Sequence, residues 1–263
     1  MPSRRQAGAA ALVAIVAACG GPGAADDGTD GRDEAGVGPA GEVLVSAAAS
    51  LTDAFVEVES AFEAAHPDVD VVLNLGGSSS LRAQILEGAP VDVFASAGRD
   101  DMDRVVAAGR ASGEPDVFAH NLLRIAVPAG NPARVDGLDD FADEALHLGL
   151  CAEDVPCGDF ARLALRRARV VPALDTNEPN VRALLTKVEL GELDAGITYA
   201  TDVASARGSV EGIDIPGDVN VVAEYPIAVL AEAPNPGAAG TFVRFVLSGA
   251  GRAILAKHGF GLP

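Results

Sequence analysis

From residue 43 to residue 263 the chain alternates short apolar segments typical of β-strands with longer segments whose apolar residues recur at helical spacing. This alternation predicts helices layered on mainly parallel sheets, which is an α/β fold. The segments expected as strands are 42–50, 70–75, 91–97, 122–128, 146–150, 195–200 and 224–230. The segments expected as helices are 51–65, 81–87, 100–108, 158–169, 181–190, 201–206 and 237–258.

The N-terminus has the pattern of an export signal. Arg4 and Arg5 precede an apolar run that ends at Cys19, and this run is too short to span a bilayer. We predict a signal peptide over 1–18. The sequence Val-Ala-Ala-Cys at 16–19 resembles a lipobox, which implies cleavage before Cys19 and a lipid on its sulfur. The alternative is an ordinary signal peptide in which this cysteine has no role.

Residues 19–42 are rich in Gly, Ala and Asp and have no apolar periodicity. Such a segment cannot bury a core, so we predict that it is a disordered tether behind a folded part that starts near residue 43. Removing 1–18 takes away two arginines and no acidic residue, and changes the formal net charge from −19 to −21. This acidity argues against nucleic acid or an anionic surface as a partner.

Two further cysteines, Cys151 and Cys157, are separated by five residues in CAEDVPC. In an exported protein this spacing favours a local disulfide, with free buried thiols as the alternative. No second cysteine pair lies near them, and a single histidine, His147, is the only one close by in the sequence, which argues against a metal site.

Several polar residues fall where a predicted strand ends and a helix begins. In open α/β sheets ligands bind at the carboxyl ends of strands, where helix N-termini present unpaired N–H groups and a partial positive charge. Together they predict an anion site that needs no lysine or arginine. Each alone has a plainer explanation: a serine can be a helix cap, GGSSS a loop, and a tyrosine part of the core. The residues at these junctions are Ser50, Ser78 with Ser79, Cys157 with Gly158, Asn180 with Val181, and Tyr199.

Five ordered motifs carry a family resemblance over nearly all of 43–263. They are VSAAASLTDAF, GGSSSLRAQILEGAPVDVFASA, EDVPCGDFAR, PNVRALLTKVELGELDAGITYATD and the closing EYPIAVL…KHGFGLP. They resemble the molybdate-binding lipoproteins and periplasmic proteins that supply ABC transporters.

The resemblance implies a two-lobed periplasmic-binding-protein fold of type II, with molybdate or tungstate held in the cleft between the lobes. Lobe one would comprise 43–125 and 226–263, and lobe two would comprise 126–225. It further implies a monomer without a cofactor, held at the outer face of the membrane by a lipidated Cys19, with an ABC permease and its ATPase as partners.

Carried over residue by residue, the resemblance assigns seven donor groups to the oxyanion and no direct cation ligand. They are the hydroxyls and amides of Ser50 and Ser78, the amides of Cys157 and Val181, and the hydroxyl of Tyr199. The chain departs from the family at Cys157, where alanine is usual, and at Gly77, where serine is frequent. Because a backbone N–H is the donor at 157, that change need not abolish binding.

Two other functions remain to be weighed. A serine-dependent enzyme is disfavoured because the chain has neither a G-x-S-x-G elbow nor a phosphate-binding G-x-x-x-x-G-K-[ST] loop, and three of its four histidines lie outside the motifs, the exception being His258 in KHGFGLP. A receptor for another oxyanion, such as sulfate or thiosulfate, is the stronger competitor.

Overall fold

The computed structural model describes residues 39–263. The predicted signal peptide, the lipobox and nearly all of the tether lie outside the described residues, although the first strand begins at Gly41, inside the predicted 19–42 tether. The strands are β1 (Gly41–Ala48), β2 (Val69–Gly76), β3 (Val93–Ala95), β4 (Asp116–Pro128), β5 (Leu148–Cys151), β6 (Thr176–Glu178), β7 (Ala195–Tyr199), β8 (Val210–Asp214) and β9 (Val222–Val229).

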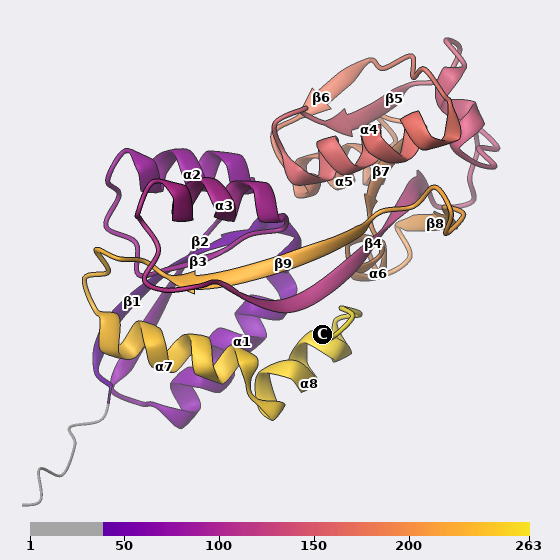
Figure 1. The fold of residues 1–263 in the computed structure, drawn as a ribbon. Coiled ribbons are helices and arrows are strands. Elements are labelled where there is room, and N and C mark those ends of the chain that lie inside the picture. Colours follow the sequence, from indigo (N-terminus) through magenta and orange to yellow (C-terminus); the bar gives the residue numbers. More distant parts are fainter. Residues whose placement is uncertain (1–38) are drawn as a thin grey trace, which may run out of the picture. The chain divides into compact units, whose positions relative to one another are not determined.

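The strands pair in the order β2-β1-β3-β9-β4-β7-β5-β6, with β8 on β4 outside this order. The long strand β4 changes partners along its length: residues up to Leu122 pair with β9, and residues from Leu123 pair with β7 and β8. Strands β4 and β9 are the two long ribbons that run side by side in Figure 1. One sheet therefore lies before the change of partners and another lies after it, with β4 common to both.

Parallel and antiparallel pairs occur together in both sheets. Strand β1 is parallel to β2 and β3, and β5 is parallel to β6 and β7. Every antiparallel pair involves β4 or β9. The α/β architecture predicted from the sequence is confirmed, but the antiparallel contribution of β4 and β9 makes the sheets mixed rather than mainly parallel.

Helices cover both faces of the first sheet. In Figure 1, α1 and α7 lie on one face and α2 and α3 on the other, while α4, α5 and α6 accompany the second sheet. The helices are η1 (Ala49–Leu51), α1 (Thr52–Ala65), α2 (Ser78–Leu86), α3 (Arg99–Ala107), η2 (Leu138–Ala142), α4 (Pro156–Ala168), α5 (Val181–Glu189), α6 (Ala200–Ser205), α7 (Pro236–Leu247) and α8 (Gly249–Lys257).

Two helices begin two or more residues earlier than the apolar periodicity predicted. Helix α2 starts at Ser78 rather than at residue 81, because its first residues are polar and carry no periodic signal. Helix α4 starts at Pro156 rather than at residue 158, since proline fits the first helical position, where no N–H donor is needed. Both shifts move a predicted site residue into the first turn of a helix.

Among the described residues, no single helix is long and apolar enough to cross a bilayer. Helices α7 and α8 reach that length and hydrophobicity only as a pair, and they are bent by 60°. Both contribute side chains to the core, including Phe242 and Leu255, so their apolar surface is used in packing.

Candidate functional site

A small cavity of about 10 Å³ lies where the N-termini of several helices meet. A space of this size holds about one water molecule. The structure brings to it all five residues predicted from the sequence, which come from distant parts of the chain. Its lining residues are Ala48, Ala49, Ser50, Gly76, Gly77, Ser78, Ala97, Val155, Pro156, Cys157, Asn180, Val181 and Tyr199.

Four of the five residues sit at the start of helices. Ser50 lies in η1, which leads into α1, and Ser78 is the first residue of α2. Cys157 is the second residue of α4, and Val181 is the first residue of α5. Backbone N–H groups in a first helical turn have no partner within the helix, and they carry the positive end of its dipole. Their convergence makes the cavity attractive to an anion.

Tyr199 supplies the most specific feature of the cavity. It ends β7 and precedes α6, and its backbone N–H donates to the Asp202 carboxylate at 3.2 Å. Its side chain is only 1% exposed, yet its hydroxyl has no hydrogen-bond partner. Burial raises the pKa of this hydroxyl, so it stays protonated. A buried, protonated donor without an acceptor indicates that a ligand completes the site.

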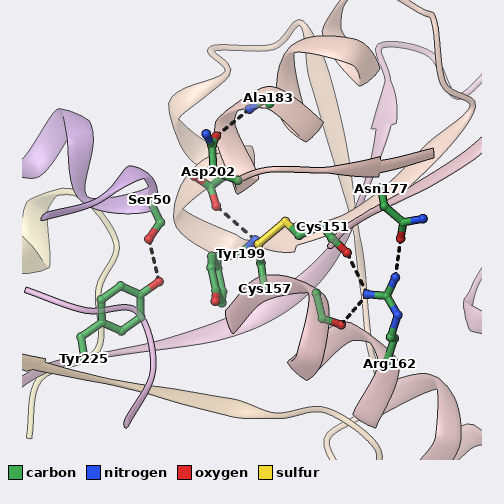
Figure 2. Close-up of a disulfide and its surroundings, with 11 residues drawn as sticks. Ser50, Cys151, Cys157, Arg162, Asn177, Ala183, Tyr199, Asp202 and Tyr225 are labelled. Carbon is green, nitrogen blue, oxygen red and sulfur yellow. Dashed lines mark hydrogen bonds between the residues drawn. A yellow bond between two sulfur atoms is a disulfide. The ribbon is translucent and has the colours of Figure 1, made fainter. Parts of the chain in front are cut away.

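The two serine hydroxyls are also arranged as donors. Ser78 Oγ accepts a hydrogen bond from the Ala97 backbone N–H at 3.0 Å, which leaves its own proton free. Ser50 Oγ lies 2.9 Å from the Tyr225 hydroxyl (Figure 2). The Asn180 side-chain oxygen is already occupied, because it accepts from the Ala183 N–H at 3.0 Å. No charged side chain lines the cavity, so no carboxylate there repels an anion.

A disulfide joins Cys151 to Cys157, with their Cα atoms 5.8 Å apart (Figure 2). Arg162 donates to the carbonyl oxygens of Cys151 at 2.7 Å and Gly158 at 3.0 Å, and also to the Asn177 side chain. The disulfide and the guanidinium together fix the loop before α4. The sulfur of Cys157 is thus engaged, and what this residue offers the cavity is its backbone.

The segments around the cavity approach one another closely at Gly77. A Cβ atom at this position would lie 2.6 Å from the Pro179 carbonyl oxygen, which belongs to the turn before α5. The same atom at Gly76 would meet only Leu81, at an ordinary 3.5 Å. The neighbouring backbone therefore favours glycine at 77, because any side chain there would meet the Pro179 oxygen.

An ion pair bridges the same two regions beside the cavity. Arg182, in the first turn of α5, pairs with Asp53, in the first turn of α1. Its Nε atom lies 3.4 Å from the buried Asp202 carboxylate, and its Nη1 atom donates to Ser205 at 3.1 Å. This arginine links η1–α1 to α5 without reaching into the cavity.

The family model for bacterial extracellular solute-binding proteins matches residues 43–261. The chain belongs to this family. The protein named molybdate-binding protein ModA in Mycobacterium tuberculosis (strain ATCC 25618 / H37Rv) is 37% identical over 261 residues, which cover 97% of this chain and 95% of that protein.

Solved structures place this solute-binding protein in the same fold group. The Azotobacter vinelandii periplasmic molybdate-binding protein superposes with a TM-score of 0.75 at 19% identity, covering 84% of this chain and 99% of that one. The sulfate-binding protein SubI from M. tuberculosis H37Rv gives a TM-score of 0.73 at 20% identity, covering 83% and 86%. At these identities the comparison shows the fold, and the two-lobed binding-protein architecture predicted from the sequence is confirmed.

A larger cavity of about 400 Å³ lies on the other side of Val155 and Pro156. Charged side chains of both signs dominate its lining, among them Arg82 and Asp101, which form an ion pair at 2.6 Å. None of the five predicted donors reaches it. The five predicted residues converge on the small cavity and not on this larger one.

Sequence reasoning missed the residues behind the donors. Tyr225, Ala97 and Arg182 contact Ser50, Ser78 and Asp202, respectively, from other elements of the fold. One signal was available: the chain has only two tyrosines, and the second stands in the EYPIAVL motif. The other contacts depend on tertiary packing and leave no local pattern.

Asp202 gives this solute-binding protein a testable pH dependence. Burial raises the pKa of its carboxyl group to about 7, against the lesser opposing effect of Arg182. Because the folded-state pKa lies above the unfolded one, the folded protein keeps a proton that the unfolded chain releases between about pH 4 and pH 7. Asp202 therefore lowers stability as the pH rises through this window.

We expect Asp202→Asn to remove this penalty. The melting temperature of the variant should exceed that of the wild type by an amount that grows from about pH 5 to pH 7 and then levels off. Thermal unfolding followed by circular dichroism across this range measures the difference. A difference that stays constant with pH would show that Asp202 is ionised in the folded protein throughout.

Proposed function

We propose that the protein captures molybdate in the small cavity and delivers it to an ABC permease and its ATPase outside the cytoplasm. The observation that carries this proposal is the buried Tyr199 hydroxyl, which has no partner and lies in a cavity lined by donors. The 37% identity to a molybdate-binding protein over 97% of the chain supports the choice of ligand.

The chemistry of the cavity suits a tetrahedral dianion. Molybdate offers four acceptor oxygens and carries no proton at neutral pH, so every oxygen can accept from a donor of the site. Hydrogen phosphate carries a proton that needs an acceptor, and the lining has no carboxylate to take it. Leaving that proton unpaired in a buried site disfavours phosphate. Tungstate has nearly the size and charge of molybdate, and we expect it to bind as well.

The donor set is sufficient for tight binding. Each hydrogen bond to a charged group contributes about 1.5–3 kcal/mol, and about seven donors are available. Ordering of the protein and loss of ligand freedom offset part of this sum. The acidic chain repels anions at long range, but salt screens this repulsion beyond about 10 Å. At contact distance the helix N-termini and hydroxyls outweigh the net charge.

Binding requires the site to open and close. A cavity of about 10 Å³ has room for about one water molecule, which is less than a tetrahedral oxyanion needs. We propose that two lobes separate at β4 and β9. The chain would cross between the lobes where β4 changes partners, between Leu122 and Leu123. This point lies slightly before the lobe boundary at 125 predicted from the sequence. The Arg182–Asp53 pair would then form on closure.

The anchoring of the protein is part of the proposal. Cleavage after residue 18 and lipidation of Cys19 would leave residues 19–40 as a leash ahead of β1, which begins at Gly41. A binding protein held at the membrane in this way stays near its permease. We propose that it acts there as a monomer.

Sulfate is the second candidate ligand, because SubI shares the fold and sulfate is also an unprotonated tetrahedral dianion. Charge and donor pattern do not separate the two anions. Only size does, since the Mo–O bond is longer than the S–O bond.

A thermal-shift panel of four anions tests the proposed function. Ligand present at about 100 times its dissociation constant adds about 2.7 kcal/mol of stability, which for a protein of this size raises the melting temperature by about 5 to 10 °C. We expect this shift with molybdate and tungstate and little shift with sulfate or phosphate at the same concentration. Equal shifts with sulfate would overturn the choice of ligand.

A further inference from the structure

A second tyrosine stands directly behind the ligand site. Tyr225 lies in β9 and is fully buried, and its hydroxyl is 2.9 Å from Ser50 Oγ and 3.4 Å from Asn121 Nδ2. Figure 2 shows the Tyr225 hydroxyl reaching toward Ser50, with Tyr199 nearby. Tyr225 does not line the small cavity, but it adjoins two residues that do: its hydroxyl meets Ser50, and its ring lies edge-on to that of Tyr199 with centroids 5.9 Å apart.

Asn121, Tyr225 and Ser50 are linked by hydrogen bonds, and the other contacts of Asn121 determine which group is the donor in each bond. The Leu122 backbone N–H donates to Asn121 Oδ1 at 3.0 Å, so the amide nitrogen must face the other way. There it lies 2.8 Å from Thr201 Oγ1 as well as near the Tyr225 hydroxyl. An amide nitrogen only donates. The Tyr225 oxygen therefore accepts from Asn121, and its own proton is left for Ser50.

The consequence falls on the Ser50 hydroxyl. Because Ser50 Oγ accepts the proton of Tyr225, its own proton is directed to another acceptor, and Ser50 lines the small cavity. Ser78 Oγ is also already an acceptor, because the backbone N–H of Ala97, which can only donate, donates to it. The Ser78 proton is therefore likewise directed to another acceptor. Burial raises the pKa of Tyr225, so the tyrosine keeps the proton that it donates.

We propose that Tyr225 and Asn121 are positioning residues that hold the Ser50 hydroxyl as an obligate donor to the bound oxyanion. The inference rests on the proposed function and deepens it, because it names what sets the selectivity of the site. A serine hydroxyl that is free to turn can accept the proton of hydrogen phosphate. A serine that already accepts from Tyr225 is directed to donate, and the protonated anion is excluded.

The packing of the ring makes a clean substitution available. Tyr225 lies edge-on to Phe118 and Phe260, with ring centroids 6.3 and 5.5 Å apart. Phenylalanine at 225 keeps these contacts and removes only the hydroxyl. Ser46→Ala is the matched control, because it also removes a buried hydroxyl from the same sheet. This hydroxyl lies away from the cavity and accepts a hydrogen bond from Asn74 at 3.2 Å.

The test measures the ratio of the dissociation constants for phosphate and molybdate by competition calorimetry at about pH 8, where phosphate is mainly the dianion that carries one proton. We expect Tyr225→Phe to weaken molybdate binding about three- to tenfold and to lower the phosphate-to-molybdate ratio at least tenfold. Ser46→Ala should leave the ratio at its wild-type value. Asn121→Ala, which frees the Tyr225 hydroxyl to reverse, should lower the ratio in the same direction.

A double substitution shows whether the effect passes through Ser50. In a Ser50→Ala background, Tyr225→Phe should change the ratio no further. A wild-type ratio in both Tyr225→Phe and Asn121→Ala would overturn the inference, as would an undiminished effect of Tyr225→Phe in the Ser50→Ala background. Failure of the wild type itself to prefer molybdate over phosphate would instead contradict the proposed function.

Discussion

Replacing Tyr199 by phenylalanine is expected to weaken molybdate binding about 10- to 100-fold, which corresponds to the loss of one hydrogen bond to a charged group. The unliganded protein should be at least as stable as the wild type. Its Tyr199 hydroxyl is buried without a partner, and removing such a group relieves a desolvation cost rather than breaking a bond. Titration calorimetry measures the first effect, and thermal unfolding without ligand measures the second.

Ser78→Ala is the informative comparison for this variant. It should weaken molybdate binding by a similar factor, but it should also destabilise the unliganded protein, because the buried Ala97 N–H loses its acceptor. Two variants with the same loss of affinity and opposite effects on stability would separate binding from folding. Wild-type affinity in both would refute the assignment of the site.

Gly77→Ala is expected to have a larger effect, a loss of affinity of about 100-fold or more. The new methyl group would lie 2.6 Å from the Pro179 carbonyl oxygen, so the turn before α5 has to move away. Val181 and its N–H donor move with that turn. Weakening even two hydrogen bonds of about 1.5 kcal/mol each accounts for a factor of this size.

The backbone at residue 77 can accept alanine without strain, because its φ of −64° and ψ of 134° are ordinary extended values. The variant should therefore fold normally and fail only in closing on its ligand. Gly76→Ala is the control: its methyl group meets Leu81 at 3.5 Å, an ordinary contact, so its affinity should stay close to that of the wild type. Equal losses in both variants would mean that the added bulk, and not the contact with Pro179, is responsible.

The alternation of apolar patterns predicted the fold class and most elements, but not the short strands β6 and β8. Strand β6 is the three-residue segment Thr-Asn-Glu, and β8 has a glycine at its centre, so neither carries an apolar alternation. Both are strands because neighbouring strands pair with them. The antiparallel pairing of β4 and β9 could not be predicted either, because the apolar pattern of a strand does not show which neighbour it pairs with.

The donor residues were predictable because their signal is local, a polar or small residue between a strand and a helix. The side chains that contact these residues from other elements of the fold were not predictable. Tyr225 meets Ser50, and Asn121 meets Tyr225, only after β4 and β9 are in place, and Arg182 meets Asp53 only when α5 faces α1. The proposed selectivity and closure therefore depend on tertiary contacts that the motifs do not show. The proposed donors, in contrast, can be read from the motifs.

The most direct test of the central claim, that the helix N-termini and hydroxyls around the small cavity bind a tetrahedral oxyanion, is a crystal structure with molybdate and anomalous data at the molybdenum edge. We expect one strong peak in that cavity, with oxygens about 2.7–3.2 Å from the donor atoms of Ser50, Ser78, Cys157, Val181 and Tyr199. A peak in the 400 Å³ cavity beside Arg82, or a small cavity without molybdenum, would contradict the account.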